Sequence, residues 1–315
     1  MHEFEIIRQY FNRSVKNPQH FPLGVGDDAA LISIPKGYEL ATSIDSLVEG
    51  THFLPETAAG DLGHKSLAVS LSDLAAMGAE PAAVLLALTL PKIDPPWLHN
   101  FSEAFYHLAN RYQVELIGGN ITKGPLAVST VTYGFVQANK AIRRSGAQPG
   151  DDIWVSGCFG DAALALAVLK KHDPLPKELH DRFFRPEPRV DLGLALIDLA
   201  HSAIDVSDGL AADLSKILEA SQVGAEILAE KVPVSKSLSS YCQQSQAVEL
   251  ALTGGEDYEL CFTAASEFRS TIAGIANKLA CRLQRIGTIH KQTGLKILDN
   301  AGRLIDLKTF GFEHF

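Results

Sequence analysis

Carboxylate side chains occur in short segments along the first half of the chain, several of them beside glycines. Asp27 and Asp28 follow the turn glycines of GVGDDAA, Asp45 ends the apolar run of LATSID, and Asp73 lies in LSDLAAMG. Taken singly, an aspartate after a glycine is usually a turn residue or a helix cap. Their repetition instead suggests one shared site.

The second half also places acidic residues beside glycines, in the segments IDVSDGL and TGGEDYEL. In an extended strand, Asp205 and Ser207 would face the same side. A turn at 207–209 would bring Asp208 to the same ligand, although Asp208 could instead cap the following helix. Glu256 and Asp257 follow two glycines in the second segment.

Carboxylates gathered in one site repel each other unless cations neutralise them. Mg²⁺ prefers carboxylate oxygens together with phosphate and water. The set therefore predicts Mg²⁺-dependent phosphate chemistry. The sequence contains no Walker A, GxSxG, HExxH or kinase catalytic-loop pattern, and no serine or cysteine nucleophile has a supporting context.

A further segment, LIGGNITKG at 116–124, has the composition of a loop that holds phosphate. Its glycines would let the backbone turn and approach a ligand closely. Lys123 precedes the last glycine and no Ser or Thr follows it, so this is not a Walker cradle. Asn120 can offer a metal ion a carbonyl oxygen but no charge.

The elements that must position these residues follow from apolar periodicity and from Gly and Pro punctuation. Leu67, Leu71 and Leu74 recur at helical spacing, with Asp61 as the predicted N-cap and Gly78 as the predicted C-cap. The other elements predicted in the first half are helices at about 3–13 and 96–111, and strands around 29–34, 40–45, 82–90, 114–119 and 126–136.

We place the domain boundary in the turn-rich passage RRSGAQPGD, which gives domains 1–145 and 146–315. The second domain is predicted to contain a helix at 160–171, a strand in HSAIDV, and a strand after the turn of TGGEDYEL. A helix after IDVSDG is indicated by the stripe Leu210, Leu214, Ile217 and Leu218. Both domains are therefore expected to be α+β, with mixed α/β order.

The composition restricts the partners. A net charge of −9 argues against nucleic-acid binding, which needs a basic face. The four cysteines have no metal or redox spacing, so we expect reduced thiols in a cytoplasmic protein. We expect no signal peptide and no membrane contact, because no apolar run of spanning length occurs.

Taken together, the segments resemble the thiamine-monophosphate kinase family. The resemblance runs almost from end to end, through EFEIIRQYF, GVGDDAA, DSLVEGTHF, LAVSLSDLAAMGAEP, LIGGNITKGP, RRSGAQPGD, AIDVSDGL, GGEDYELCFT and GFEHF. This family belongs to the superfamily of aminoimidazole-ribonucleotide synthetase and selenophosphate synthetase. The resemblance implies a two-domain fold that binds ATP between an N-terminal dimerising domain and a C-terminal α+β domain, and hence a homodimer.

The resemblance also implies a reaction and residue roles. ATP and thiamine monophosphate would give ADP and thiamine diphosphate by direct in-line transfer, with several Mg²⁺ ions and no catalytic side chain. The metal ligands implied are Asp27, Asp28, Ser43, Ile44, Asp45, Asp73, Asn120, Asp205 and Asp208. The ATP contacts implied are Gly119, Asn120, Arg144 and Ser207, and the substrate contacts are His52, Glu256 and Phe312.

Some of these residues have simpler explanations, and two depart from the family pattern. Arg144 could be a surface arginine, His52 a structural histidine, and Phe312 a packing residue. Ile44 replaces the usual threonine, which is harmless only if the backbone carbonyl is the ligand. Asn120 replaces the usual aspartate, so we expect one metal ion to bind more weakly.

Two alternative functions remain open on the sequence alone. The chain could be another ATP-dependent enzyme of the same superfamily. A selenophosphate synthetase would need a reactive Cys near the N-terminus, whereas no Cys precedes Cys158, and an aminoimidazole-ribonucleotide synthetase would lack GFEHF. The chain could also be a non-catalytic protein that binds ATP or thiamine phosphate.

Overall fold

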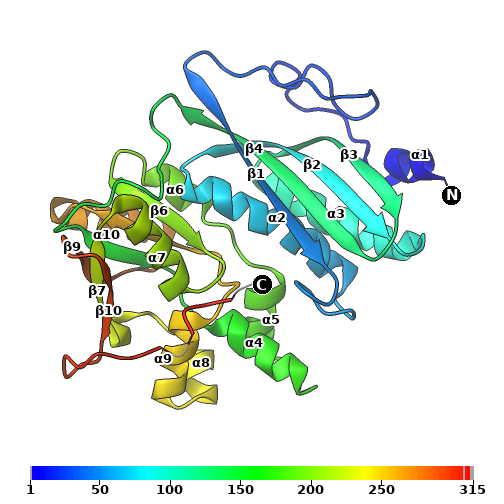
Figure 1. Cartoon of the computed structure of the whole chain (residues 1–315). Helices are drawn as coiled ribbons and strands as arrows, with labels where there is room; N and C mark the ends of the chain where they lie inside the picture. Colours follow the sequence, from blue (N-terminus) through cyan, green and yellow to red (C-terminus); the bar gives the residue numbers. More distant parts are fainter. Residues whose placement is uncertain (1, 308, 313–315) are drawn as a thin grey trace. The chain divides into compact units, whose positions relative to one another are not determined.

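The computed structural model describes residues 2–307 and 309–312 and divides into two compact units (Figure 1). Unit 1 consists of Met1–Leu74 and Ala79–Asn139, and unit 2 consists of Ala75–Gly78 and Lys140–Phe315. The boundary that we placed between residues 145 and 146 stays a prediction of where the functional domains meet in the sequence.

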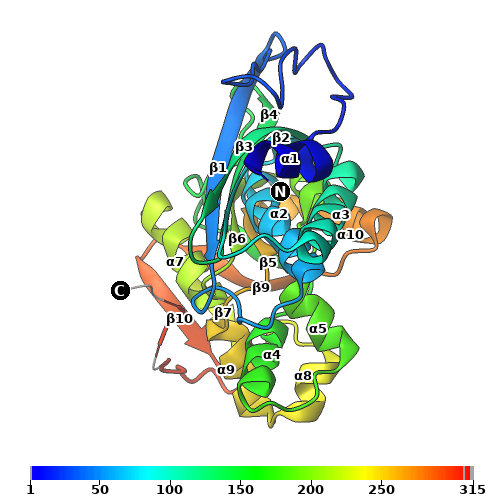
Figure 2. The ribbon, with the colours of Figure 1, turned by 90° about the vertical axis from the view of Figure 1, so that its right-hand side faces the viewer.

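Unit 1 is built around one four-stranded sheet. Its elements are α1 (Glu3–Ile6), a π-helical turn (Ile7–Phe11), β1 (Tyr38–Val48), α2 (Ala59–Ala76), β2 (Glu80–Leu90), α3 (Pro95–Arg111), β3 (Glu115–Lys123) and β4 (Ala127–Gln137). The strand order is β1-β4-β2-β3, with β2 and β3 parallel and the other neighbours antiparallel. Helices α2 and α3 lie on one side of this sheet (Figure 2).

The predicted helical stripe explains how α2 packs. Leu67, Leu71 and Leu74 are almost completely buried, as their spacing predicts. Gly78 has φ +63°, and the N–H of Gly78 donates to Ala75 while that of Ala79 donates to Leu74. These bonds form a Schellman C-cap. The N-cap prediction for Asp61 is wrong, because the helix already begins at Ala59 and places Asp61 in its first turn.

Two predictions near the N-terminus are also corrected. The opening helix is shorter than 3–13 and becomes π-helical after Ile6. The predicted strand 29–34 does not form, and a single bridge joins Leu31 to Leu23. Buried and exposed side chains do alternate in this segment, because Ala30 and Ile32 pack inward while Leu31 is 55% exposed. No neighbouring strand completes a ladder, and alternation alone cannot supply one.

The predicted loop 116–124 is instead mostly strand, because β3 continues to Lys123. A register shift after Val84 accommodates Ile117 as a bulge, and Ala87 is then paired with Asn120. Gly119 is required by this close pairing. With φ +156°, a Cβ there would lie 1.9 Å from the carbonyl oxygen of Leu86. The glycine therefore serves strand packing, which the sequence alone did not reveal.

Unit 2 is built around a six-stranded sheet of order β10-β7-β9-β5-β8-β6, in which only the β10–β7 pair is parallel. Its strands are β5 (Asp152–Ser156), β6 (Ala200–Val206), β7 (Gly224–Leu228), β8 (Glu259–Ala264), β9 (Leu283–His290) and β10 (Gly294–Leu298). Its helices are α4 (Asp161–Lys170), α5 (Lys177–Phe184), α6 (Val190–Ala195), α7 (Leu210–Ser221), α8 (Lys236–Tyr241), α9 (Gln244–Thr253) and α10 (Arg269–Leu279), with short 3₁₀ turns at Ala229–Lys231 and Ser266–Phe268.

The predicted stripe on α7 forms part of the core of unit 2. Leu210, Leu214 and Ile217 are fully buried and pack with the inward residues of the sheet. The predicted α+β class is confirmed, since each unit combines a mixed sheet with helices. Among the described residues, no helix combines the length and the apolar character that a membrane span requires.

Candidate functional site

The first group of predicted site residues lies where β1 faces α2. The hydroxyl of Ser43 donates to Asp73, and the hydroxyl of Ser70 donates to Asp45 at 2.7 Å. Ser70 lies 2.7 Å from the hydroxyl of Thr130 as well. The strand thus directs Ser43 and Asp45 to the helix that carries Asp73, and brings two carboxylates together.

The electrostatics of this group reflect burial first and the nearby negative charge second. Burial, reinforced by the neighbouring charge of Asp73, raises the pKa of Asp45 to about 6, against the lowering effect of the Ser70 hydrogen bond. In the described part of the chain, no Lys or Arg forms an ion pair with Asp45 or Asp73. A cation placed here would favour the ionised form of both.

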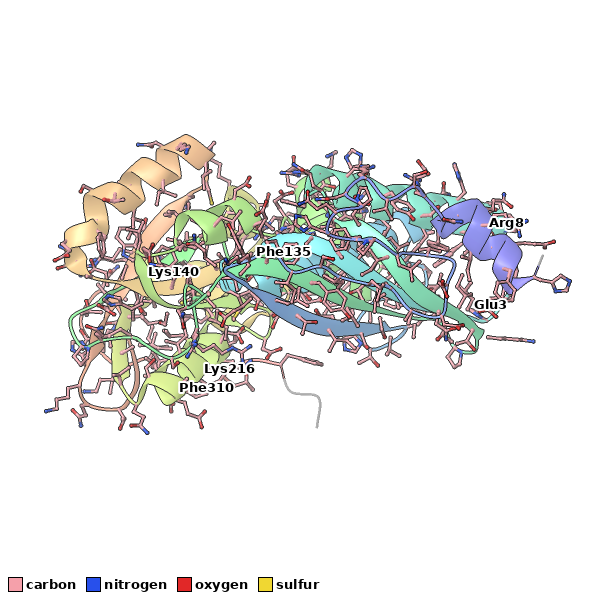
Figure 3. All side chains as sticks on the ribbon, turned by 90° about the horizontal axis from the view of Figure 1, so that it is seen from above. Glu3, Arg8, Phe135, Lys140, Lys216 and Phe310 are labelled. Carbon is pink, nitrogen blue, oxygen red and sulfur yellow. The ribbon has the colours of Figure 1, made fainter. Side chains whose placement is uncertain are left out.

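The second group lines a cavity of about 890 Å³ within unit 1. The turn residues Asp27 and Asp28 contribute to its wall together with Ile44, Gly119 and Asn120. The Asp27 carboxylate accepts the N–H of Asp28 at 2.8 Å, which fixes the turn. Apolar residues of the N-terminal segment and the sheet complete the wall, and Glu3, labelled in Figure 3, lies at the same cavity.

The alternation of the sheet separates these two groups. Ile44 is paired with Val131 and Asn120 with Ala87, and all four line the cavity. Ser43 and Asp45 point the opposite way, toward α2. The side chain of Ile44 therefore cannot join the Asp45 group, and only its backbone could contact a metal ion there.

His52 follows β1 and is held by a local hydrogen bond. The backbone N–H of Val48 donates to Nδ1 of His52 at 3.1 Å. Because that nitrogen accepts, the neutral ring carries its proton on Nε2. The bond thus fixes the tautomer and the orientation of the ring at the end of β1.

The third group surrounds the turn between β6 and α7 in unit 2. Asp205 is buried near the end of β6, and Ser207 and Asp208 form the turn that follows. The carboxylate of Asp213 accepts the backbone N–H groups of Ser207, Asp208 and Gly209 at 3.0, 3.0 and 3.2 Å. The residue before the helix is Gly209, so the helix-cap role considered for Asp208 is wrong.

The predicted substrate contacts Glu256 and Phe312 join the same turn. The N–H of Glu256 donates to the Ser207 carbonyl at 2.7 Å, and the N–H of Phe312 donates to the Asp208 carbonyl at 2.9 Å. Glu256 and Tyr258 have φ +67° and +50°, which non-glycine residues rarely adopt. Asp257 between them is buried and accepts the N–H of Gly160 at 2.9 Å. Phe312 is 53% exposed.

Arg144 lies on an exposed loop of unit 2 that Ser221, the last residue of α7, holds in place. The Ser221 hydroxyl accepts the N–H groups of Gly146 and Ala147 at 3.1 Å and donates to the Arg144 carbonyl at 3.3 Å. Helix α7 thus supports two predicted ATP contacts, the turn at Ser207 and the loop at Arg144.

The residues that sequence reasoning missed are those that support the predicted ones, chiefly Ser70, Asp213 and Ser221. A signal existed for Asp213, because an acidic residue in the first turn of a helix favours bonds to exposed N–H groups. Ser70 and Ser221 carry no comparable signal, because their partners are distant in sequence.

The donor sets fit a hard divalent cation, although each group is small. Only oxygen atoms are offered, and the Asp45–Asp73 pair has unbalanced negative charge. Within residues 2–307 and 309–312, no three His, Cys, Asp or Glu side chains come together as a metal site. A Mg²⁺ ion would therefore take phosphate or water as further ligands, as this ion usually does.

The sequence of each half of the chain matches a known family model. Residues 26–136 match the model of the AIR synthase related protein, N-terminal domain, and residues 148–300 match that of the C-terminal domain. The chain is 43% identical to the thiamine-monophosphate kinase of Haemophilus influenzae over 322 aligned positions, covering 100% of this chain and 98% of that protein.

Solved structures agree with this result. The crystal structure of thiamine-monophosphate kinase from Stenotrophomonas maltophilia has a TM-score of 0.85 at 43% identity and covers 93% of this chain and 94% of its own. The structure of AaThiL complexed with AMPPCP and TMP has a TM-score of 0.80 at 29% identity, with 99% and 96% covered. The chain belongs to the AIR synthase related proteins and, within them, to the thiamine-monophosphate kinase family.

Proposed function

We propose that this protein is a thiamine-monophosphate kinase, which converts ATP and thiamine monophosphate to ADP and thiamine diphosphate. The observation that carries the proposal is the full-length similarity to the Haemophilus influenzae enzyme. The similar fold of AaThiL, whose complex holds AMPPCP and TMP, supports the same pair of ligands.

The transfer is direct. An oxygen of the thiamine monophosphate phosphate attacks the γ-phosphorus of ATP in line, the bond from that phosphorus to the bridging oxygen breaks, and ADP leaves. Such a reaction asks the protein for positioning and charge stabilisation, and no covalent intermediate is needed. The exposed loop of Arg144 offers a guanidinium for ATP phosphate, and Ser207 and Gly119 supply further ATP contacts.

The substrate contacts are proposed from position and exposure. His52 follows β1 directly, and the Val48 N–H fixes the orientation of its ring. Glu256 lies in a segment that is constrained by hydrogen bonds at Glu256, Asp257 and Tyr258. Phe312 is exposed, so its ring can stack on an aromatic substrate. The pairing of Glu256 and Phe312 with one turn favours a common ligand for the two.

Three groups of residues would hold Mg²⁺. They are Ser43, Asp45 and Asp73 beside α2, with the Ile44 carbonyl nearby; Asp27, Asp28 and Asn120 at the cavity; and Asp205 and Asp208 in unit 2. When bound, such ions neutralise charge on the phosphate oxygens. The crowded carboxylates of the first group are the strongest support for this requirement.

The protein is further proposed to act as a homodimer in the cytoplasm. The sheet of unit 1 exposes apolar side chains, with Ile44 65% and Val48 38% exposed, as a surface that a second copy could cover. All four cysteines are free, which suits a reducing compartment. Light scattering of the protein and of Val48→Glu tests the dimer, because a buried carboxylate at position 48 would disfavour it.

A coupled assay of ADP release tests the function. Thiamine monophosphate, ATP and Mg²⁺ should together give turnover, and omission of any one should abolish it. Mass spectrometry should identify thiamine diphosphate as the product. Measurable binding of ATP and thiamine monophosphate without turnover would contradict the enzyme proposal and favour a binding protein.

A further inference from the structure

The turn that carries Asp208 depends on a carboxylate whose two oxygens both have partners within the chain. Oδ2 of Asp213 accepts three backbone N–H groups from the turn, and the side chain is 1% exposed. Its other oxygen, Oδ1, lies 2.7 Å from Nζ of Lys216. Asp213 is therefore a positioning residue for the turn, already saturated by partners of this chain.

Lys216 also pairs with Asp208. Its Nζ lies 2.6 Å from Oδ2 of Asp208, so one ammonium group bridges two carboxylates (Figure 3 labels Lys216 on α7). The side chains of Lys216 and Asp208 are 38% and 34% exposed, so both can move into solvent. Burial lowers the pKa of Lys216, but the hydrogen bonds to Asp208 and Asp213 outweigh it and raise the pKa overall.

We propose that Lys216 is a resident counter-ion of Asp208, and that a divalent cation binding to Asp208 displaces the Lys216 ammonium from that carboxylate. The inference rests on the proposed function, which supplies the expectation of a metal ion at Asp208. Lys216 keeps its second partner after displacement, because Oδ1 of Asp213 remains beside it. Only one of the two ion pairs must break.

Two consequences follow from the charges. In the metal-free protein, Lys216 relieves repulsion between Asp208 and Asp213, so its loss should destabilise the native state. With a divalent ion present, the Lys216 charge competes with and repels the ion, so its loss should tighten binding. For partly exposed charges a few ångströms apart, we expect an effect on the order of fivefold.

The test uses the full-length protein and Mn²⁺, whose free concentration is measured by electron paramagnetic resonance. Lys216→Met should bind Mn²⁺ about fivefold more tightly than the parent at the affected site. Lys278→Met, which removes one exposed charge from α10, is the matched control and should leave the affinity unchanged. Equal or weaker Mn²⁺ binding by Lys216→Met would overturn the proposal.

The same substitution in an Asp208→Asn background shows whether the tighter Mn²⁺ binding depends on Asp208. Asp208→Asn should weaken the site, and adding Lys216→Met to it should give no tightening. If Lys216→Met still tightened Mn²⁺ binding in the Asp208→Asn background, the proposal would be overturned, because the effect would not depend on the Asp208 carboxylate. None of these measurements uses thiamine monophosphate, so failure of the kinase assay would be seen separately from failure of this proposal.

Urea unfolding gives an independent readout. Without metal, Lys216→Met should unfold at a lower urea concentration than the parent, and saturating Mn²⁺ should narrow the difference. A parent and variant that unfold identically without metal would show that Lys216 does not relieve the two carboxylates, which contradicts its role as a counter-ion.

Discussion

Two carboxylate clusters, one in each unit, are stabilised in opposite ways. In unit 1, Asp45 and Asp73 receive hydrogen bonds from serine hydroxyls, and no Lys or Arg of the described residues pairs with them. In unit 2, the buried Glu259 receives Arg189 through two nitrogen atoms, each at 2.6 Å, and Arg182 at 3.0 Å. The Asp45–Asp73 pair therefore keeps unbalanced charge, whereas the charge of Glu259 is balanced within the protein.

This difference indicates which carboxylates serve ligand binding and which serve folding. A partly buried pair of carboxylates without a cation costs stability, so its persistence in a fold suggests a ligand that supplies the missing charge. A carboxylate that already has two guanidinium partners has no such need, and its loss should damage folding first. The following predictions test this division.

The largest effect is expected in unit 1 from Asp45→Asn or Asp73→Asn. Each removes a charged metal ligand, so turnover should fall by at least about a hundredfold. Thermal unfolding of the metal-free protein should show a fold as stable as that of the parent. Thr42→Ala, on the other face of the same strand, is the control. Near-normal activity of either variant would contradict the assignment of that residue.

In unit 2, Arg189→Met should act on stability. It strips the buried Glu259 of its two-nitrogen partner, and breaking such a pair costs about 3–5 kcal/mol. Urea unfolding measures the loss. Arg303→Met is the matched control, since Arg303 is 80% exposed in its pair with Asp299 and its loss should have little effect on stability. Equal losses for both would remove the distinction between buried and exposed pairs.

Asp257 sharpens the comparison, because burial raises its pKa to about 8 although Arg182 and the Gly160 N–H lower it. Between about pH 4 and pH 8 the native state therefore keeps a proton that the unfolded chain has lost. Stability of the parent should fall as the pH rises through this window. Asp257→Asn does not titrate, so its stability relative to the parent should increase by about 1–3 kcal/mol from pH 5 to pH 8.5.

Urea midpoints at the two pH values check this prediction. Asp257→Ala, which removes the acceptor of the Gly160 N–H, should be destabilised at both. A difference between Asp257→Asn and the parent that does not change with pH would show that Asp257 is ionised throughout.

The smallest effect is expected from Asn120→Asp. It adds a charge at the cavity that contains Asp27 and Asp28, so the Mg²⁺ concentration for half-maximal turnover should fall severalfold, by roughly the amount that one carboxylate adds in a partly exposed site. A Mg²⁺ titration of the activity measures it. An unchanged Mg²⁺ dependence would place Asn120 away from any metal ion.

The sequence predicted those features whose signals are local. The Leu67–Leu74 stripe, the C-cap at Gly78 and the strand containing Asp45 all follow from spacing and residue type. The strand predicted at 29–34 failed because its pairing depends on a partner that alternation does not specify. The loop predicted at Gly119 failed because the glycine is needed for contact with Leu86, a residue far away in sequence.

The candidate site shows the same limit. Family motifs point to Asp45, Asp73 and Asp208, but not to the faces on which their side chains lie. The separation of Asn120 from Asp45 depends on strand register, which the structure provides. Ser70 and Lys216 were missed because a serine or lysine within a helix is ordinary until its neighbours are known.

The alternation of side-chain directions along β1 restricts where residues can be inserted or deleted. Ser43 and Asp45 face α2, while Ile44 between them lines the cavity. Because strand faces repeat every two residues, one inserted or deleted residue before Ser43 would exchange the two surfaces at once. Relatives should therefore vary in length outside this strand, for example in the segment 49–58, while single-residue insertions within β1 should be rare.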